Sequence, residues 1–381
     1  MIRVLQIGMT DNVGGIENYL INYYRNINKS KVQFDFINIY DNDLCFKKEI
    51  ISSGGNIYNI SSYYKNPFKY IHELISIIKK NNYEIVHCNM NSAVMIYPLI
   101  AAKLANVNVI IAHAHNASSD KGIIKSILHN INRVFVPLLA NKYFACSDKA
   151  GEWFFSKKII QSNNYYVIKN AIDTSKFKFN LEVRKLKREK LQISNDSFVI
   201  GHVGRFNKQK NHEYIIEIFK YINSYVKKSK LILVGSGPLL SKIKSKVLAY
   251  NLQNDVIFLG ERNDVNELMM AFDVFLLPSL YEGLPLVGIE AQSSGLKCYW
   301  SDNITKTINL LETNQFFSLN KSPEEWANII CSGKTNTSDF RTNAYIKIKK
   351  SGFCIKDEAK KLTELYEKFI LDDSLQKRRK N

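Results

Sequence analysis

Two glutamates eight residues apart flank a turn that leads into an expected helix. Glu282 and Glu290 lie in the segment Tyr281-Glu282-Gly283-Leu284-Pro285-Leu286-Val287-Gly288-Ile289-Glu290, which follows an apolar strand at 274–277. Pro285 suits the first helical position, and Gly283 lets a ligand approach the backbone closely. The amides around Leu284–Val287 would bind phosphate or sugar oxygens. Each glutamate could accept hydrogen bonds from a pair of hydroxyls, Glu290 from a ribose and Glu282 from a hexose.

Two cations follow another expected strand. Val203-Gly204-Arg205-Phe206 ends the strand at 198–203, and Lys210 comes five residues after Arg205, just before the next helix. Arginine offers a planar fork of donors and lysine a mobile point charge, so the pair could grip a diphosphate from two sides. Each such contact contributes roughly 4 kcal/mol at about 4 Å, before desolvation, for an effective dielectric near 20.

Two glycine-rich turns offer weaker signals. Gly14-Gly15-Ile16-Glu17 follows the first strand and opens a helix, where free amides and the dipole favour an anion. An ordinary strand-to-helix turn explains the same pattern. In Gly235-Ser236-Gly237, Leu240 stands where a dinucleotide motif needs its third glycine, which counts against NAD or FAD.

Histidines mark the expected strands near residues 84–88 and 109–113. His113 and His115 share one face by the period-two alternation of a strand, so either could reach a ligand at the strand end. His87, inside an apolar strand, is expected to be a satisfied core residue.

No motif indicates a metal or another cofactor. Asp41-Asn42-Asp43 lies far from the other motifs, so the two cations would replace a metal ion. The cysteines are scattered, with no CxxC pair or spaced histidine partner, and are expected to be free thiols. They are Cys45, Cys88, Cys146, Cys298, Cys331 and Cys354.

The elements that must position these residues form two alternating series. Apolar strands and amphipathic helices alternate before and after a basic stretch near 181–195, and 381 residues exceed one ordinary core. We therefore predict an α/β chain of two Rossmann-like, doubly wound domains facing each other across a cleft. The predicted ranges are 1–180 for the acceptor side, 181–356 for nucleotide binding, and 357–381 for a C-terminal helix with a basic tail.

The formal charge of +18 favours anionic partners. The runs 184–188 and 377–380 are compatible with docking on an anionic membrane surface, although solvated faces are the commoner explanation. No pattern typical of nucleic-acid binding is present. With no leader and no apolar stretch long enough to cross a bilayer, the chain is expected in the cytoplasm, peripheral at most on the inner membrane face.

Taken in order, these motifs resemble the family 4 retaining glycosyltransferases of GT-B fold. The acidic pair matches that family's E-x7-E spacing. Asn170-Ala171-Ile172-Asp173 is similar to its NGID, with Ala171 in place of glycine. Ile85–Cys88 and Ile111–Asn116 resemble members that build capsular and exopolysaccharides. The likeness covers roughly residues 1 to 370 and implies a C-terminal helix that packs back on the first domain.

The resemblance also implies roles for individual residues. Glu282 and His115 would be catalytic, with His113 as the competing histidine. Arg262 and Asn263 would lie near the base. The residues implied in donor binding are Gly14, Gly15, Arg205, Lys210, Gly283, Leu284, Pro285 and Glu290.

The implied reaction moves a sugar, with retention, from a nucleoside-diphosphate donor, expected to be a UDP-sugar. The acceptor would be a glycan or lipid-linked glycan in surface polysaccharide synthesis. A GT-B epimerase or phosphorylase would share the phosphate clamp and stays an alternative. So does a non-catalytic partner subunit, although such a subunit would be expected to lose the acidic pair or the clamp.

Overall fold

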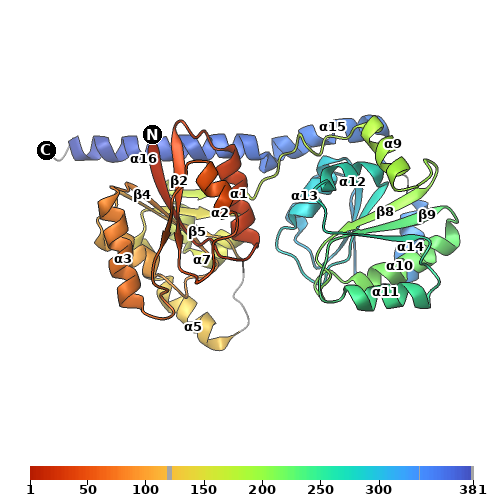
Figure 1. Ribbon diagram of the computed structural model, residues 1–381, viewed down its shortest axis with the longest axis horizontal. Helices are drawn as coiled ribbons and strands as arrows, with labels where there is room; N and C mark the ends of the chain where they lie inside the picture. Colours follow the sequence, from red (N-terminus) through yellow and green to blue (C-terminus); the bar gives the residue numbers. More distant parts are fainter. Residues whose placement is uncertain (118–121, 334, 379–381) are drawn as a thin grey trace. The chain divides into compact units, whose positions relative to one another are not determined.

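The chain folds into two compact units. The computed structural model describes residues 1–117, 122–333 and 335–378. Unit 1 comprises Met1–Ala171 and Ile355–Asn381, and unit 2 comprises Ile172–Cys354. Each contains one parallel sheet covered by helices on both faces (Figure 1). The predicted α/β class with two Rossmann-like domains is confirmed.

Unit 1 is built on a seven-stranded sheet in the order β3-β2-β1-β4-β5-β6-β7. Its strands are β1 Ile2–Ile7, β2 Val32–Asn38, β3 Ile57–Asn59, β4 Ile85–Met90, β5 Val109–Ala114, β6 Lys142–Ala145 and β7 Tyr165–Val167. Its helices are α1 Gly15–Asn26, α2 Lys47–Ser52, α3 Pro67–Lys80, α4 Tyr97–Leu104, α5 Ile123–Asn132, α6 Val136–Leu139, α7 Asp148–Phe154, α8 Lys157–Ile160 and α16 Ile355–Arg378.

Unit 2 is built on a six-stranded sheet in the order β10-β9-β8-β11-β12-β13. Its strands are β8 Phe198–Val203, β9 Ser229–Val234, β10 Val256–Gly260, β11 Val274–Leu277, β12 Lys297–Ser301 and β13 Gln315–Phe317. Its helices are α9 Leu181–Lys190, α10 His212–Tyr225, α11 Leu240–Ala249, α12 Val265–Ala271, α13 Leu286–Ser293, α14 Pro323–Ser332 and α15 Ser338–Ile348, with short turns η1 Lys306–Ile308 and η2 Lys349–Phe353.

The central strands are buried along their whole length because helices cover both faces of each sheet. All six residues of β4 and of β5 are buried. Side chains of α1 and α16 pack on one face of the first sheet, and those of α3, α4 and α7 on the other. Continuous burial of this kind is what a parallel, doubly covered sheet requires.

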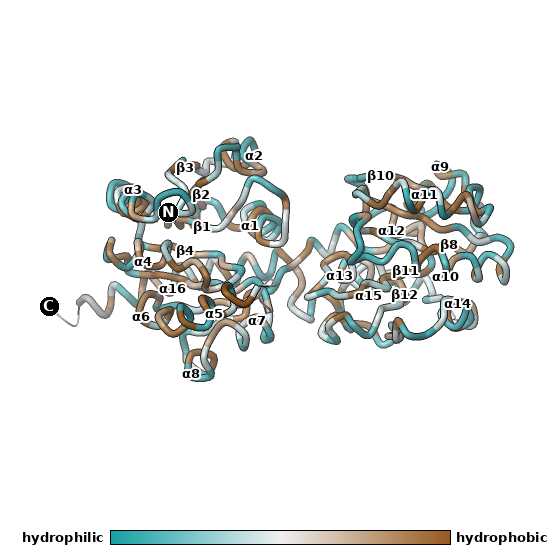
Figure 2. Tube along the Cα trace, turned by 90° about the horizontal axis from the view of Figure 1, so that it is seen from below, coloured by the Kyte–Doolittle hydropathy of each residue, from teal (hydrophilic) through white to brown (hydrophobic). Residues whose placement is uncertain are grey.

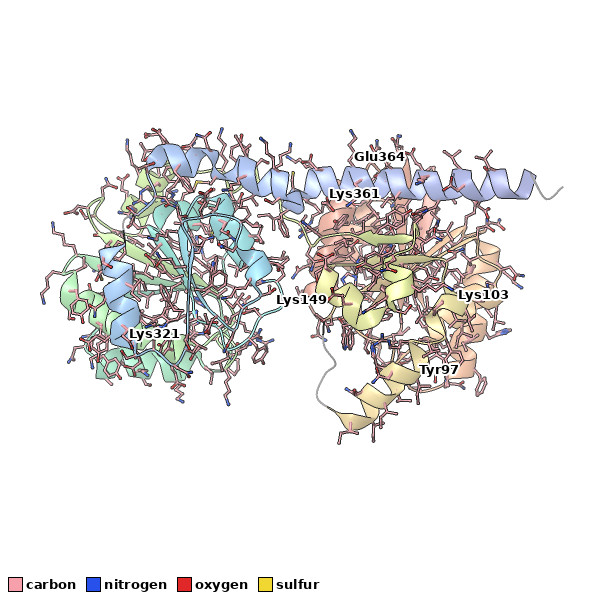
Figure 3. The ribbon with its side chains drawn as sticks, turned by 180° about the vertical axis from the view of Figure 1, so that it is seen from behind. Tyr97, Lys103, Lys149, Lys321, Lys361 and Glu364 are labelled. Atoms are coloured by element: carbon pink, nitrogen blue, oxygen red, sulfur yellow. The ribbon has the colours of Figure 1, made fainter. Side chains whose placement is uncertain are left out.

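The last helix, α16, returns to unit 1 as predicted. Leu362, Tyr366 and Phe369 are buried against the core of that unit, whereas Lys361 and Glu364 lie on its exposed side (Figure 3). The helix begins at Ile355, two residues before the expected start at Asp357, which lies in its first turn.

Several elements differ from the prediction. The basic stretch near 181–195, expected as a boundary, contains α9, and three short strands, β7, β12 and β13, were not predicted. In the described part of the chain, no helix is both long enough and apolar enough to cross a bilayer.

Candidate functional site

The site residues of unit 2 follow four neighbouring strands. The loops after β10, β9, β8 and β11 emerge at the same edge of the sheet because these parallel strands lie side by side in that order. From β8 the strand order continues through β9 to β10 on one side, and from β11 it continues through β12 to β13 on the other, so β8 and β11 form a topological switch point. Ligands of doubly wound folds bind at such switch points, and here Arg205 and Glu282 follow the two strands that form it.

Lys210 and Glu282 form an ion pair that joins the loops after β8 and β11. Lys210 Nζ lies 2.6 Å from Glu282 Oε1, and both side chains are largely buried. Gln209 Nε2 donates to the other Glu282 oxygen at 3.2 Å and to the Tyr281 carbonyl at 3.0 Å. The Leu280 amide donates to the Gln209 carbonyl at 2.8 Å. Glu282 therefore has a fixed orientation before any ligand binds.

Arg205 is exposed and forms no ion pair with any described residue. Its loop packs against the glycine turn that follows β9. Gly235 has φ +130°, and a Cβ there would lie 2.2 Å from the Gly204 carbonyl oxygen. The Phe206 amide donates to the Ser236 carbonyl at 2.8 Å. The Gly235-Ser236-Gly237 turn thus supports the cation loop, a role that the sequence did not reveal.

Glu290 lies on α13, and its carboxylate has no hydrogen-bond or ion-pair partner among the described residues. It keeps some solvent exposure, yet protein surrounds it closely, and this burial raises the pKa of its carboxyl to about 7. A carboxylate without a partner inside protein is poorly stabilised, so a ligand with hydroxyl donors would be favoured there.

The turn that leads into α13 leaves space for a ligand. A Cβ on Gly283 would meet nothing within 4 Å, and no side chain caps the helix. The amides of Leu284 and Leu286 thus stand at an uncapped helix start. The helix begins at Leu286, so Pro285 is the preceding cap residue and not, as predicted, the first helical residue.

The candidate base-contacting residues follow β10. The Arg262 guanidinium donates two bonds of 2.8 Å to Asp264, which holds the side chain within its own loop. Gly235 N donates to the Gly260 carbonyl at 2.7 Å, so this loop adjoins the glycine turn. Whether Arg262 and Asn263 contact a base stays a prediction.

Most cations of the basic run 184–188 form ion pairs within unit 2. Arg188 is fully buried and lies 2.7 Å from Asp273, which also pairs with Arg184. Lys187 pairs with Asp264 and Glu267. A membrane role for this run stays a prediction. In the second run, 377–380, residues 379 and 380 lie outside the described part of the chain.

In unit 1, Gly14 and Gly15 begin α1 after β1, at the corresponding edge of the first sheet. A Cβ on Gly15 would meet nothing within 4 Å, whereas one on Gly14 would lie 2.7 Å from Glu17 Oε2. Glu17 is buried, and its Oε1 accepts a bond of 3.0 Å from the Thr10 amide. Glu17 therefore holds the turn in place, while Gly15 leaves its outer side open.

Two histidines form a buried network with the C-terminal helix. His87 Nε2 lies 3.0 Å from His113 Nδ1, and His87 Nδ1 lies 2.7 Å from the Tyr366 hydroxyl. Gln6 Nε2 donates to that hydroxyl at 3.2 Å. Every bond has a donor and an acceptor if Tyr366 donates to His87 and His87 donates to His113. The expectation that His87 is a satisfied core residue is confirmed.

His113 and His115 do share a face, with ring centroids 4.0 Å apart. His113 is fully buried, and burial holds its pKa well below the usual range. His115 lies partly exposed beyond the strand end, and burial lowers its pKa to about 3. Its Nε2 lies 3.0 Å from Asn89 Oδ1, and a neutral ring must donate there. Of the two, His115 is the better placed to meet a substrate.

A cavity of about 400 Å³ lies at the β1/β4 switch point of unit 1. Its lining combines aromatic rings with amide and cationic groups: Thr10, Tyr40, Tyr63, Tyr64, Asn89, Asn91, Asn116 and Lys125. Asn89 connects this cavity to His115. Aromatic faces beside amide groups suit a sugar, and the volume suits a small ligand. The sequence offered no signal for it because its lining comes from segments that are far apart in the chain.

Potential metal ligands are dispersed or already paired. Asp41 pairs with Lys65, and Asp43 with Lys47. Across the described residues, no three His, Cys, Asp or Glu side chains are grouped to hold a metal ion. All six cysteines are free thiols.

Two Rossmann-like units in one chain, with cations and glutamates at the strand ends of the second, define the GT-B class of glycosyltransferases. Residues 13–176 match the family described as Glycosyltransferase Family 4, and residues 183–336 match Glycosyl transferases group 1. Over 336 residues the chain is 36% identical to EpsF of Bacillus subtilis (strain 168), described as a glycosyltransferase, with 86% of each chain covered. The chain therefore belongs to the family 4 glycosyltransferases, and it is a transferase enzyme.

Further similarities agree with this family. The chain is 34% identical over 248 residues to the UDP-Gal:alpha-D-GlcNAc-diphosphoundecaprenol alpha-1,3-galactosyltransferase of Escherichia coli, which covers 64% of this chain and 63% of that protein. The crystal structure of HepE from Anabaena in complex with UDP has the same fold, with a TM-score of 0.79 at 18% identity, covering 97% of this chain and 100% of that one.

Proposed function

We propose that this enzyme transfers a sugar from a UDP-sugar to a glycan carried on a polyprenyl diphosphate, with retention of the anomeric configuration, in the synthesis of a surface polysaccharide. The observation that carries the proposal is the set of groups beside β8 and β11: the Lys210–Glu282 pair, the unpaired Arg205 and the unpartnered Glu290. The E. coli relative uses a UDP-sugar and a diphosphoundecaprenol-linked acceptor.

In this proposal, unit 2 holds the donor. Arg205 and Lys210 stabilise the diphosphate as negative charge develops on it, which lowers the barrier to its departure without a metal ion. Glu290 accepts the two ribose hydroxyls, and Glu282 accepts hydroxyls of the transferred sugar. Lysine has three N–H donors, so Lys210 can bind a phosphate oxygen while it keeps its bond to Glu282.

Unit 1 holds the acceptor. The aromatic cavity binds the acceptor sugar, and Asn89, which lines this cavity, is hydrogen-bonded to His115. The neutral ring of His115 can position a substrate hydroxyl but cannot protonate it near neutral pH. Retention is proposed from the family resemblance of the Glu282–Glu290 pair.

The test is a screen of UDP-, GDP-, ADP- and CMP-sugars by mass spectrometry, first alone and then with acceptors such as short-chain polyprenyl-diphosphate GlcNAc. Release of UDP that depends on an acceptor, together with an α-linked product from an α-linked donor by NMR, supports the proposal. Conversion of a nucleotide sugar without any acceptor would instead identify an epimerase. Sugar phosphate formed with inorganic phosphate would identify a phosphorylase. Binding of donors with no turnover under any condition would favour a non-catalytic subunit.

A further inference from the structure

Polar side chains from three strands and the C-terminal helix form an almost closed circle of hydrogen bonds in unit 1. Its members are Gln6 on β1, His87 and Asn89 on β4, His113 on β5, His115 after β5, and Tyr366 on α16. Figure 2 shows α16 beside β4, with hydrophilic and apolar residues alternating along its trace. Asn89 is the member of the circle that lines the cavity of unit 1.

The Asn89 amide fixes the direction of the first bonds. Its Nδ2 donates to the Ile7 carbonyl at 3.2 Å and to Gln6 Oε1 at 3.0 Å. A backbone carbonyl can only accept, so Asn89 Oδ1 faces His115 Nε2, which must donate to it at 3.0 Å. Burial lowers the pKa of His115 to about 3, so its ring is neutral and its Nδ1 bears a lone pair.

The Gln6 amide fixes the bonds on the other side. Because its Oε1 accepts from Asn89, its Nε2 donates to the Tyr366 hydroxyl at 3.2 Å. Burial raises the pKa of Tyr366 well above the usual range, so the hydroxyl keeps its hydrogen and donates it to His87 Nδ1 at 2.7 Å. Burial also lowers the pKa of His87 and of His113, so both rings are neutral. His87 Nε2 therefore donates to His113 Nδ1 at 3.0 Å, and His113 carries its hydrogen on Nε2.

The two ends of this series meet between His113 and His115, whose ring centroids lie 4.0 Å apart. His113 Nε2 bears a hydrogen and His115 Nδ1 bears a lone pair, and both are buried with no partner among the described residues. The buried Tyr19 hydroxyl also has no partner there, and its ring centroid lies 5.0 Å and 4.9 Å from those of the two histidines. A hydroxyl both accepts and donates, so Tyr19 can join the two nitrogens, directly or through a water molecule. Every member then donates in the same direction around the circle.

We propose that Tyr366 is a positioning residue for the acceptor side, which holds the Asn89 amide and the His115 ring in one hydrogen-bonding state through this circle. Both Nδ2 hydrogens of Asn89 are already used, so the group that Asn89 offers to the cavity is the second lone pair of its Oδ1. The cavity would therefore select a hydroxyl donor at this point. That the hydroxyl belongs to an acceptor sugar rests on the proposed function, whereas the circle itself does not.

The first measurement is NMR of the histidine ring nitrogens in ligand-free protein. It reports which nitrogen bears the hydrogen and whether the other accepts a hydrogen bond. In the wild type, His87, His113 and His115 should be neutral near neutral pH, each with its hydrogen on Nε2. In the Tyr366→Phe variant, which lacks only the hydroxyl, the Nδ1 signal of His87 should shift, and signals of His113 and His115 should shift with it.

The matched control is the Tyr23→Phe variant. Tyr23 is also fully buried, and its hydroxyl donates to the Lys169 carbonyl at 2.7 Å, outside the circle. Each variant loses buried hydrogen bonding of one tyrosine hydroxyl, so both should unfold at a somewhat lower temperature than the wild type. Only the Tyr366→Phe variant should change the signals of the three histidines.

The second measurement is transfer to short-chain polyprenyl-diphosphate GlcNAc. The Tyr366→Phe variant should have an acceptor KM raised about tenfold and an unchanged affinity for UDP in calorimetry, because the displaced groups lie on the acceptor side. Gln6→Met breaks the circle at the neighbouring bond and should have the same effect. The double variant should be no worse than either single variant, because both changes act on one network. The Tyr23→Phe variant should keep the kinetics of the wild type.

His113 and His115 signals that do not change in the Tyr366→Phe variant would overturn the proposal, as would a hydrogen on Nδ1 of His87 in the wild type. An acceptor KM equal to that of the wild type would also overturn it. Equal kinetic losses in the Tyr366→Phe and Tyr23→Phe variants would show a general effect of lost stability and would refute a positioning role. Absence of any transfer by the wild type would refute the proposed function, while the NMR spectra would still show whether the circle exists.

Discussion

Replacing Glu290 by glutamine should stabilise the enzyme and weaken its donor binding at the same time. Burial raises the pKa of this carboxyl from 4.5 to about 7, so between those pH values the folded state binds more protons than the unfolded state. Stability attributable to Glu290 therefore falls as pH rises from about 4.5 to about 7 and is constant above that. The variant has no such titration.

The size of the effect follows from the same values. A rise from 4.5 to about 7 corresponds to about 3 kcal/mol, because each pH unit is worth about 1.4 kcal/mol. The side chain keeps some solvent exposure, so we expect the Glu290→Gln variant to be about 1–3 kcal/mol more stable than wild type at pH 8. The difference should disappear below about pH 4, where the wild-type carboxyl is mostly protonated in both states.

Two measurements check this reasoning. Urea denaturation of ligand-free protein at pH 5 and pH 8 gives the stability difference between variant and wild type. Calorimetric titration with UDP gives affinity, which we expect to fall about 10–100-fold in the variant, because an amide accepts the ribose hydroxyls less well than a carboxylate does. In the wild type, UDP affinity should also fall as pH drops below 7. A variant that is no more stable at pH 8, or that binds UDP as the wild type does, would refute the assignment of Glu290.

Three further predictions concern both units. Arg205→Ala should weaken UDP binding about 10–100-fold with unchanged thermal stability, while Lys208→Ala, an exposed neighbour on the same loop, should change neither. The Gly283→Ala variant should fold normally, because the added methyl group would meet no protein atom. It should lose donor affinity, because the methyl group would fill space that is proposed to hold the ligand. Gly235→Ala should instead lower stability by at least about 1–3 kcal/mol in denaturation, because of its positive φ and the nearby Gly204 carbonyl. His115→Ala should reduce kcat in the transfer assay with little change in UDP affinity; equal activity would remove it from the site.

The sequence predicts where the apolar strands end better than it predicts the strands whose buried polar residues depend on long-range hydrogen bonds. The apolar runs of β8 and β11 locate Arg205 and Glu282, because continuous burial leaves an unambiguous signal. The strand β12 has polar residues at both ends, Lys297 and Ser301, and both are buried. Only the folded sheet supplies a partner such as the Ser279 carbonyl, which accepts from the Ser301 hydroxyl. A pattern of polarity therefore misses this strand.

Long-range contacts account for the other features that the sequence did not predict. Tyr366 reaches His87 of β4 from the far end of the chain, a contact that no local spacing encodes. Arg188 belongs to a run that resembles a solvated basic face, and only its pairing with Asp273 shows it to be structural. In α5, the spacing of the isoleucines indicates an apolar helix face, but spacing alone cannot tell whether the core or another partner covers it.

The pairing of Lys210 with Glu282 has a consequence for catalysis. Two largely buried charges 2.6 Å apart are already desolvated and oriented before the donor arrives, and Gln209 fixes the second carboxylate oxygen. In the proposed function, a diphosphate bound beside them would meet a cation that needs no rearrangement, with part of its charge offset by Glu282. Arg205, unpaired and exposed, has no competing carboxylate and can add its fork when the ligand is present. In the proposed function, the oriented Lys210 and the unpaired, exposed Arg205 would together stabilise the negative charge that develops on the diphosphate.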